Sequence, residues 1–414
     1  MTTQTAPTLS RTLARRIIEQ VGSSGQPPEE GLHYFSVGLE HYLHAIESEY
    51  VSDYIRDGGA AFKMVVGLYG GGKTHFLYSV RDQAWNHEYA VAYVSLKSSG
   101  ECPFHALDLV YKTIAGSIMP PLPAAEREHG YDRGIGALLR AWYGQRYQAY
   151  QNEGLSVDMT RERLRDDIES LDIKPSISFG NAIRAALMTL HNNREEAFNT
   201  VCQWLLGEGF DRRIHGPYGI QQKIDRTTAM VMIRSLGRTM RALGYTGLVI
   251  LLDEAERVPS LSTRNREQHL SNLRELIDEC SQSSFAGIMV FYAVPDENFL
   301  EGRTQVYEAL VQRLSTVFTT LNPTGVKILL EGTINDHVEF LCQVGQRLAS
   351  IYATAYQMEF PPIELDQLIQ AIAAWAERVR YGDEGYKRLF VQSLIQGLRI
   401  LHRENRVPSV EELR

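Results

Sequence analysis

The feature that most constrains this chain is the glycine-rich stretch at residues 67–74, GLYGGGKT. It fills every specified position of the pattern GxxxxGK[ST]. The apolar run at residues 62–66 before it predicts a strand, and residues 74–80 after it predict a helix. A strand that leads through a glycine-rich turn into a helix is the setting in which this pattern binds phosphate. The sequence therefore predicts a site for a nucleoside triphosphate, against the alternative of a glycine-rich turn that matches by chance.

Each residue type in this stretch has a physical role. Glycines let backbone N–H groups curl around phosphate oxygens, beside the positive end of the helix dipole. The glycines concerned are Gly67, Gly70, Gly71 and Gly72. Lys73 is expected to reach the β- and γ-phosphates of ATP, and the Thr74 hydroxyl to hold Mg²⁺. His75, the next residue, is expected among the nucleotide-binding residues.

A second stretch supplies the acids that such a site needs. The apolar residues 247–252 run directly into Asp253 and Glu254. Asp253, at the carboxyl end of the predicted strand, is expected to hold Mg²⁺. Glu254 is expected to orient and deprotonate the attacking water, which favours a hydrolase over a small-molecule kinase. The alternative is a buried strand that ends in a solvated acidic turn.

Composition excludes several other classes of protein. With a net charge of −8, a broad nucleic-acid-binding face is not expected, although a local basic patch is compatible with that total. The four cysteines are widely separated and include no CxxC pair, so they predict reduced thiols rather than a zinc site. Because no apolar run reaches about 18 residues and no signal peptide is visible, we expect a cytoplasmic protein without a membrane segment.

The order of predicted elements indicates the fold class and its divisions. Strands alternate with helices on both sides of a charged stretch without strands, where helices are expected at residues 133–154, 160–170 and 181–206. This predicts an α/β protein: a P-loop core with a parallel sheet flanked by helices, a helical insertion and a C-terminal helical lid domain. The expected divisions are an N-terminal extension at 1–30, the core at 31–121 and 226–332, the insertion at 122–225 and the lid at 333–414.

Taken in order, these parts resemble the AAA+ class of ATPases, closest to its origin-recognition and STAND-like branch. A narrower resemblance is carried by residues 14–19, 22–28, 31–38 and 67–77, which look like the BREX (bacteriophage exclusion) ATP-binding family with BrxD-like members. The family resemblance implies an ATPase of a bacterial antiphage defence system. Its members are encoded with defence genes, often beside a large helicase-like protein.

The AAA+ resemblance also suggests roles for residues outside the two motifs. The end of the predicted strand at 288–294 is expected to carry a polar sensor of the γ-phosphate, with Tyr292, Asp296 and Asn298 all possible. Arg313 is the candidate that reaches a neighbouring subunit's phosphate, and Arg303 competes with it.

The helical lid and the N-terminal segment supply two further candidates. Arg388 is expected to contact the nucleotide from the lid, and Val37 and Gly38 are expected to border the adenine. For the arginines, the alternative is an ordinary solvated helix residue.

Two hypotheses of function follow. The first is an oligomeric Mg²⁺-dependent ATPase that remodels or loads a partner acting on nucleic acid, such as a helicase, with contact to DNA possible. The second is a regulatory switch that binds ATP, hydrolyses it slowly and has no motor activity. The insertion is a candidate surface for partner contacts, although its arginines alternate with acidic residues as on an ordinary solvated helix.

Overall fold

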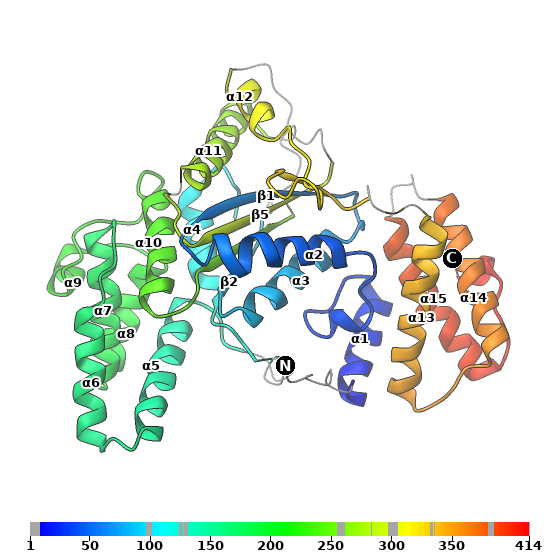
Figure 1. Ribbon diagram of the computed structural model, residues 1–414, viewed down its shortest axis with the longest axis horizontal. Coiled ribbons are helices and arrows are strands. Elements are labelled where there is room, and N and C mark those ends of the chain that lie inside the picture. The colour runs from blue at the N-terminus through cyan, green and yellow to red at the C-terminus, as the bar shows by residue number, and fades with distance from the viewer. Residues whose placement is uncertain are drawn as a thin grey trace. The chain divides into compact units, whose positions relative to one another are not determined.

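The structure is a computed structural model of the chain (Figure 1). It describes residues 9–96, 102–123, 127, 131–254, 261–282, 284–296, 305–331, 334, 336–379 and 385–413. The chain divides into two compact units. The first comprises Met1–His44, Val66–Val80 and Leu329–Arg414, and the second comprises Ala45–Val65 and Arg81–Ile328.

The second unit is built on a mostly parallel sheet with the strand order β3-β2-β4-β5-β1-β6 among the described residues. Its strands are β1 Ala60–Val66, β2 Ala90–Ser95, β3 Ile118–Met119, β4 Leu248–Asp253, β5 Ile288–Val294 and β6 Lys327–Leu329. β4 pairs in parallel with β2 on one side and with β5 on the other. Every residue of β1, β4 and β5 is buried, which explains why these strands are apolar almost throughout, apart from Lys63 of β1 and Asp253 of β4, rather than alternating.

Two helices on one side of this sheet connect it to the rest of the unit. Helix α4 (Leu107–Ser117) packs against β2, and α10 (Ala229–Ala242) packs against both β4 and α4. α10 also contacts α7 (Ile177–His191), so it joins the sheet to the helical insertion. The short strand β3 pairs antiparallel with β2 at the edge of the sheet.

The remaining helices outside the insertion and the lid lie before and after the phosphate loop along the chain. Helix α2 (Glu40–Ile46) is continued by a π-helix at Glu47–Tyr54. Helix α3 (Lys73–Asn86) follows the phosphate loop. Helices α11 (Thr263–Ser281) and α12 (Gln305–Arg313) flank β5 along the chain and contact each other.

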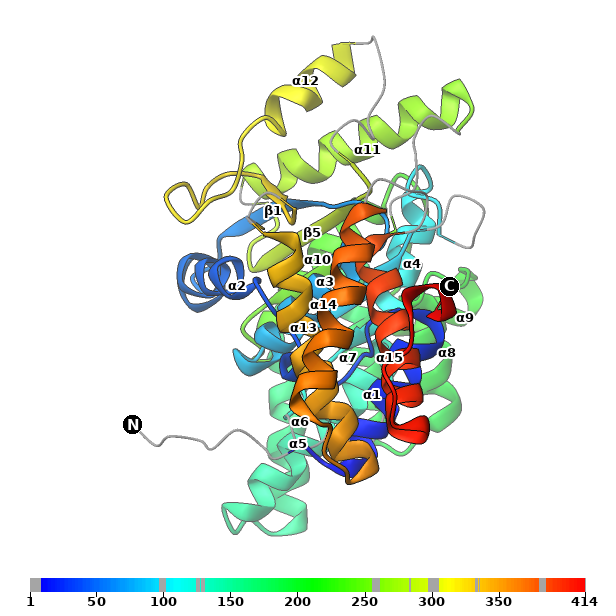
Figure 2. The ribbon, with the colours of Figure 1, turned by 90° about the vertical axis from the view of Figure 1, so that its right-hand side faces the viewer.

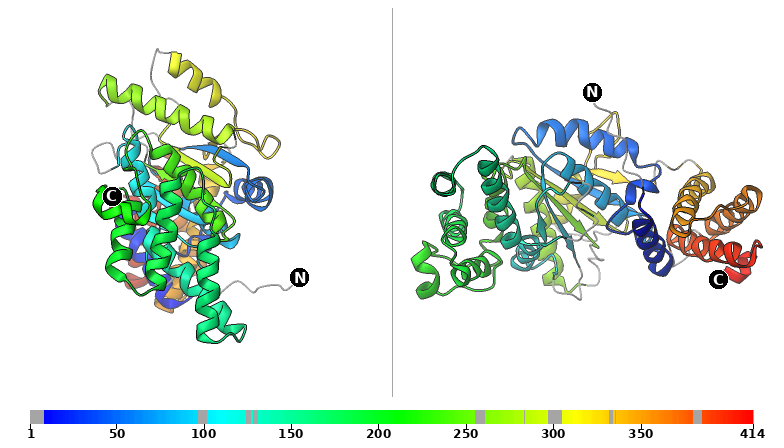
Figure 3. Two further views of the ribbon diagram at one scale, coloured as in Figure 1. Left: turned by 90° about the vertical axis from the view of Figure 1, so that its left-hand side faces the viewer. Right: turned by 90° about the horizontal axis from the view of Figure 1, so that it is seen from below.

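The insertion is a set of helices that pack side by side (Figure 3). They are α5 Ile135–Asn152, α6 Val157–Ser170, α7 Ile177–His191, α8 Glu195–Leu205 and the short α9 Arg212–His215. The prediction of a single helix at residues 181–206 is wrong, because two helices, α7 and α8, occupy this stretch. The break lies at Asn193, whose φ of 55° is left-handed, a conformation that asparagine tolerates better than most residues.

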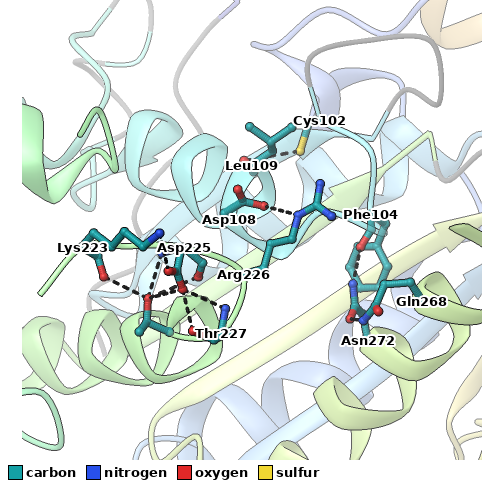
Figure 4. Close-up of polar contacts among 11 residues, drawn as sticks. Cys102, Phe104, Asp108, Leu109, Lys223, Asp225, Arg226, Thr227, Gln268 and Asn272 are labelled. Atoms are coloured by element: carbon teal, nitrogen blue, oxygen red, sulfur yellow. Dashed lines mark hydrogen bonds and ion pairs between the residues drawn. The ribbon is translucent and has the colours of Figure 1, made fainter. Parts of the chain in front are cut away.

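A polar network anchors the chain where it returns from the insertion to the sheet (Figure 4). Arg226 lies 3.4 Å from Asp108 of α4. Asp225 accepts hydrogen bonds from the Thr227 hydroxyl at 2.7 Å and backbone N–H at 3.0 Å, and lies 3.1 Å from the Lys223 ammonium. The hydrogen bonds from Thr227 and then Lys223 lower the pKa of Asp225 to about 2, so its carboxylate stays charged.

The same view shows how the segment before α4 is fixed to α11 (Figure 4). The Asn272 side-chain amide donates to the carbonyl oxygen of Phe104 at 2.9 Å, and Gln268 donates to Asn272 at 2.8 Å. Asn272 is 2% exposed, so these bonds satisfy a polar group inside the core.

The first unit contains a helical bundle assembled from distant parts of the chain (Figure 2). Its helices are α1 Arg11–Ser24, α13 His337–Tyr356, α14 Pro362–Arg378 and α15 Tyr386–Glu404. α1 buries Leu13, Ile17, Ile18 and Val21 and packs against both α13 and α15. A helix from the beginning of the chain therefore shares one apolar core with the helices at its end.

These observations confirm the predicted fold class of a P-loop core with a helical insertion and a C-terminal helical domain. The cysteines are free thiols, three of them buried: Cys102, Cys202 and Cys280. Among the described helices, none combines the length and apolar character that a membrane span requires.

A buried histidine makes the second unit sensitive to acid. His269 of α11 is 4% exposed, and its Nε2 lies 2.9 Å from the Tyr292 hydroxyl of β5. Burial, and then the nearby His105, lower the pKa of His269 to about 3. Because the unfolded chain binds a proton near pH 6.5 and the folded chain does not, folding stability falls as the pH drops below 6.5.

We predict that replacing His269 by glutamine flattens this acid dependence. Between pH 8 and pH 5, the neutral His269 should lower the free energy of unfolding by about 2 kcal/mol, because only the unfolded chain takes up a proton. Urea unfolding at both pH values measures the difference, with wild-type protein and His269→Gln compared under identical conditions. An equal loss of stability on acidification in both proteins would contradict the prediction.

Candidate nucleotide-binding site

The phosphate loop begins at the carboxyl end of β1 and is shaped by its glycines. Gly70 and Gly72 have φ values of 68° and 97°, in the left-handed region that favours glycine. A side chain at Gly71 would place its Cβ 2.8 Å from the Leu68 carbonyl oxygen. The turn is closed by a hydrogen bond of 2.9 Å from the Gly71 N–H to that same oxygen. Gly70, Gly71 and Gly72 are thus positions that a residue with a side chain fills only with strain.

Lys73 and Thr74 form the first turn of α3, directly after this turn. The Lys73 ammonium donates to the carbonyl oxygens of Gly67 at 2.7 Å and Leu68 at 2.9 Å. The first turn of a helix presents N–H groups toward an anion, and Thr74 adds a hydroxyl oxygen of the kind that Mg²⁺ prefers. This end of α3 has no acidic residue in its first turn, so nothing on the helix itself opposes a phosphate.

His75 joins the phosphate loop to the segment that carries Val37 and Gly38. Its Nε2 lies 2.5 Å from the Ser36 hydroxyl, which itself donates to the Leu32 carbonyl oxygen at 2.9 Å. The serine proton is thereby used, so we assign the proton of this contact to His75 Nε2. Burial, and then the charge of Lys387, lower the pKa of His75 to about 4, so the ring is neutral at pH 7.

Val37 and Gly38 follow Ser36 in that segment. Val37 is buried, and Gly38 has a φ of 75°. A Cβ at Gly38 would lie 3.6 Å from the ring of Phe340 on α13. Their role beside the adenine stays a prediction. Ser36, the residue before them, contacts His75 of α3.

The lid helix α15 contacts the phosphate loop through two neighbouring cations. Arg388 donates from Nη1 to the Tyr69 hydroxyl at 2.8 Å, and its guanidinium carbon lies 4.9 Å from the centre of that ring. Lys387 donates to the Gly71 carbonyl oxygen at 2.8 Å. The sequence singled out Arg388 and missed Lys387, although both stand in the same polar first turn of the helix.

The acidic part of the site is held by hydrogen bonds between β4 and β2. Asp253 is 1% exposed, and its Oδ2 accepts a hydrogen bond of 2.7 Å from the Tyr93 hydroxyl. Its Oδ1 accepts the backbone N–H of Glu254 at 2.8 Å. Ser95, directly opposite Asp253 in the parallel register, donates its hydroxyl to the Glu254 carboxylate. Tyr93 and Ser95 were not expected from the sequence.

Glu254 differs from Asp253 in its exposure and backbone. It is exposed, and its φ of 55° is left-handed, a conformation that costs a residue with a side chain on the order of 1 kcal/mol or more. The bonds to Asp253 and Ser95 hold it there. The strand end therefore presents one buried, fixed carboxylate and one that reaches solvent.

The sensor candidates differ in their surroundings. Tyr292 is buried within β5, and its hydroxyl is paired with His269. Asp296 is half-buried just beyond the strand. Asn298 and Arg303 lie outside the described residues.

Arg313 is ion-paired within its own chain. Its Nε lies 2.6 Å from Asp278 Oδ1 and its Nη2 lies 3.4 Å from Oδ2, a two-pronged contact with α11. Its Nη1 also donates to the Ala309 carbonyl oxygen at 2.9 Å. A contact with a neighbouring subunit's phosphate would require the pair with Asp278 to open.

The fold and these motifs define a P-loop nucleotide-binding protein of the AAA+ class. Within this class, the family described as BREX system ATP-binding protein BrxC/D matches residues 9–414. The chain belongs to that family and is an ATP-binding protein of a BREX system. No curated protein and no solved structure shows a significant match. The resemblance seen in the sequence is confirmed at the level of the family.

We predict that removing the Tyr93 hydroxyl destabilises the buried acid. In Tyr93→Phe the Asp253 carboxylate loses a hydrogen bond to a charged group, at a cost of roughly 1–3 kcal/mol. Urea unfolding should show this loss. The matched control is Tyr147→Phe, which removes a hydroxyl on the insertion that forms no hydrogen bond within the described part of the chain. Equal stability of the two variants would show that the Tyr93–Asp253 bond contributes nothing.

Proposed function

We propose that this chain is a Mg²⁺-dependent ATPase in which Glu254 activates the attacking water. The observation that carries the proposal is the pair of unlike carboxylates at the end of β4. Asp253 is buried and bonded on both oxygens, whereas Glu254 is exposed. A fixed acid suits metal binding, and an accessible acid suits proton transfer. Their position, one at the last residue of a buried strand and one directly after it, supports this division of roles.

The chemistry assigns each motif residue one task. Glu254 takes a proton from water as the water oxygen forms a bond to the γ-phosphorus. The bond from that phosphorus to the bridging oxygen breaks, which gives ADP and inorganic phosphate. Lys73 binds the β- and γ-phosphate oxygens, and Thr74 and Asp253 supply oxygen ligands for the metal. Bound Mg²⁺ neutralises charge on the triphosphate.

We further propose that the ATPase acts as an oligomer and remodels or loads a partner such as a helicase. Membership in a BREX ATP-binding family supports a place in antiphage defence. The insertion α5–α9 supports the partner role, because it adds a helical surface that a nucleotide site does not need. The proposal includes contact with DNA, which the comparison of turnover with and without DNA tests.

Glu254→Gln should separate ATP binding from hydrolysis. The amide is nearly isosteric with the carboxylate but accepts no proton, so turnover should fall by about 100-fold or more. ATP affinity should stay within about twofold of wild type, since the phosphate loop is unchanged. Phosphate release and equilibrium ATP binding measure the two quantities.

Three results would argue against this assignment. Substantial turnover in Glu254→Gln would remove the water-activating role from Glu254. Retained ATP binding in Lys73→Ala would mean that nucleotide is held somewhere other than the phosphate loop. Phosphorylation of an added small molecule by the wild-type protein would instead identify a kinase.

The ion pair between Arg313 and Asp278 favours a second candidate, the slow regulatory switch. An arginine held by a carboxylate of its own chain is not available to a neighbour until that pair opens. In the switch, ATP binding would reorganise the lid contacts at the phosphate loop, and hydrolysis would only reset them.

The two candidates differ in how turnover depends on assembly. For the oligomeric ATPase, turnover per chain should rise with protein concentration, and Arg313→Ala should lower it by about 10³-fold at saturating assembly. For the switch, turnover should be flat with concentration, and Arg313→Ala should change it little. Steady-state phosphate release over a range of protein concentrations, with and without DNA, distinguishes them.

A further inference from the structure

The helical bundle of the first unit brings the two ends of the chain together in a defined direction (Figure 2). Near the start of α1, Arg11 donates from Nε to the carbonyl oxygen of Ala355 at 3.2 Å, close to the end of α13. At the other end of α1, a Cβ on Gly25 would lie 2.3 Å from Cγ of Arg388, close to the start of α15. Helix α1 is therefore antiparallel to both, and its first turns lie beside the last turns of α13 and α15.

Four arginines form an arginine cluster at this end of the bundle: Arg11 and Arg15 of α1, and Arg399 and Arg403 of α15. Arg11 is fixed by its bond to α13, and Arg399 lies 3.0 Å from Glu19 Oε1. Arg15 and Arg403 are exposed, and neither is ion-paired within the part of the chain that the structure describes. The cluster is thus positively charged, in a chain whose net charge is −8.

Two stacked tyrosines lie beneath the cluster. The ring centres of Tyr352 and Tyr356 are 4.5 Å apart, and the Arg15 guanidinium carbon lies 5.3 Å from the centre of the Tyr356 ring. Burial raises the pKa of Tyr352 to about 12, and the charges of Arg399 and Arg403 oppose that rise. Arg15 is therefore held on a packed ring while it stays exposed. A cation that is already positioned loses less conformational freedom when it binds an anion.

Other arginines of the same two segments have carboxylate partners. Arg16, the next residue of α1, lies 3.8 Å from Glu30. Arg406, just beyond α15, lies 2.8 Å from both Glu404 and Glu412. Because these carboxylates offset the charge of Arg16 and Arg406, the two residues provide a matched comparison for Arg15 and Arg403.

We propose that Arg15 and Arg403, supported by Arg11 and Arg399, form a contact for the phosphate backbone of a nucleic acid. This inference rests on the proposed contact with DNA and gives it a location. A row of separate cations suits a strand that carries a negative charge at every nucleotide. Arginine suits phosphate because its planar group donates two parallel hydrogen bonds. A guanidinium group that lies on an aromatic ring also offers a flat surface on which a base can stack.

Equilibrium binding of DNA to the full-length chain tests the assignment, with a labelled single strand and a duplex of the same mixed sequence over a range of salt concentrations. The double variant Arg15→Gln/Arg403→Gln should weaken DNA binding about tenfold or more, and should reduce the slope of log affinity against log salt by about 1–2. Loss of affinity for either form of DNA supports the proposal. The form that loses more is the one that the cluster binds.

The matched control is Arg16→Gln/Arg406→Gln. It removes the same number of charges from the same two segments, but at ion-paired positions, so DNA affinity should stay within about twofold of wild type. ATP binding should be unchanged in both double variants, which shows that each chain is folded.

Glu19→Gln provides a measurement of opposite sign. It removes the carboxylate that pairs with Arg399, so DNA binding should tighten about twofold or more, a gain that structural damage does not produce. If Arg15→Gln/Arg403→Gln loses ATP binding as well as DNA binding, Glu19→Gln decides alone.

Several outcomes would overturn the proposal. They are a wild-type chain that binds no DNA, wild-type DNA affinity in Arg15→Gln/Arg403→Gln, an equal loss in the matched control, and weaker binding in Glu19→Gln. Displacement of the DNA by polyglutamate at the same concentration of negative charge would instead identify a surface for acidic peptides. Each of these results leaves the proposed ATPase chemistry intact, because Glu254→Gln and Lys73→Ala test that chemistry without DNA.

Discussion

Burial of the sheet is the constraint on which the rest of the structure depends. Water cannot reach the polar side chains of a strand that is covered on both faces. Each such side chain therefore needs a hydrogen-bond partner within the protein. Asp253 meets this need with the Tyr93 hydroxyl and the backbone of Glu254. Lys63 of β1, 2% exposed, meets it with the Tyr50 hydroxyl and two carbonyl oxygens of the segment 323–325, at 2.7–2.8 Å. Burial lowers the pKa of Lys63 to about 7.

The sequence predicted those parts of the fold that depend on local signals. Nearly continuous apolar runs indicated the main strands, because a strand covered on both faces is apolar at most positions. The phosphate loop was recognisable because it is rich in glycine. Left-handed backbone angles at Gly70 and Gly72, and a close carbonyl oxygen at Gly71, require glycine within the loop itself. Asp253 and Glu254 could be singled out because they stand at the end of such a strand and directly after it. In each case the sequence pattern and the structural feature that it indicates lie within a few residues of each other.

The features that the sequence missed depend on partners far along the chain. Ser95 and Tyr93 gain their roles only when β2 lies beside β4, and nothing in their own neighbourhood marks them. α1 has an ordinary amphipathic pattern, which does not say that α13 and α15 cover it. β3 consists of only Ile118 and Met119, too short to be distinguished from the end of the preceding helix.

The lid shows why these distant contacts matter for function. Arg388 touches Gly25 at the end of α1 and Tyr69 in the phosphate loop, so one side chain connects the helical bundle with the loop. If ATP binding at the phosphate loop changes the lid contacts, ATP affinity and lid position are linked. The linkage is reciprocal: a partner that favours one lid position changes ATP affinity by the same factor by which ATP changes the affinity for that partner. A partner that binds α1 or α15 could therefore act on the nucleotide without touching it, through the differential contacts of the two lid positions.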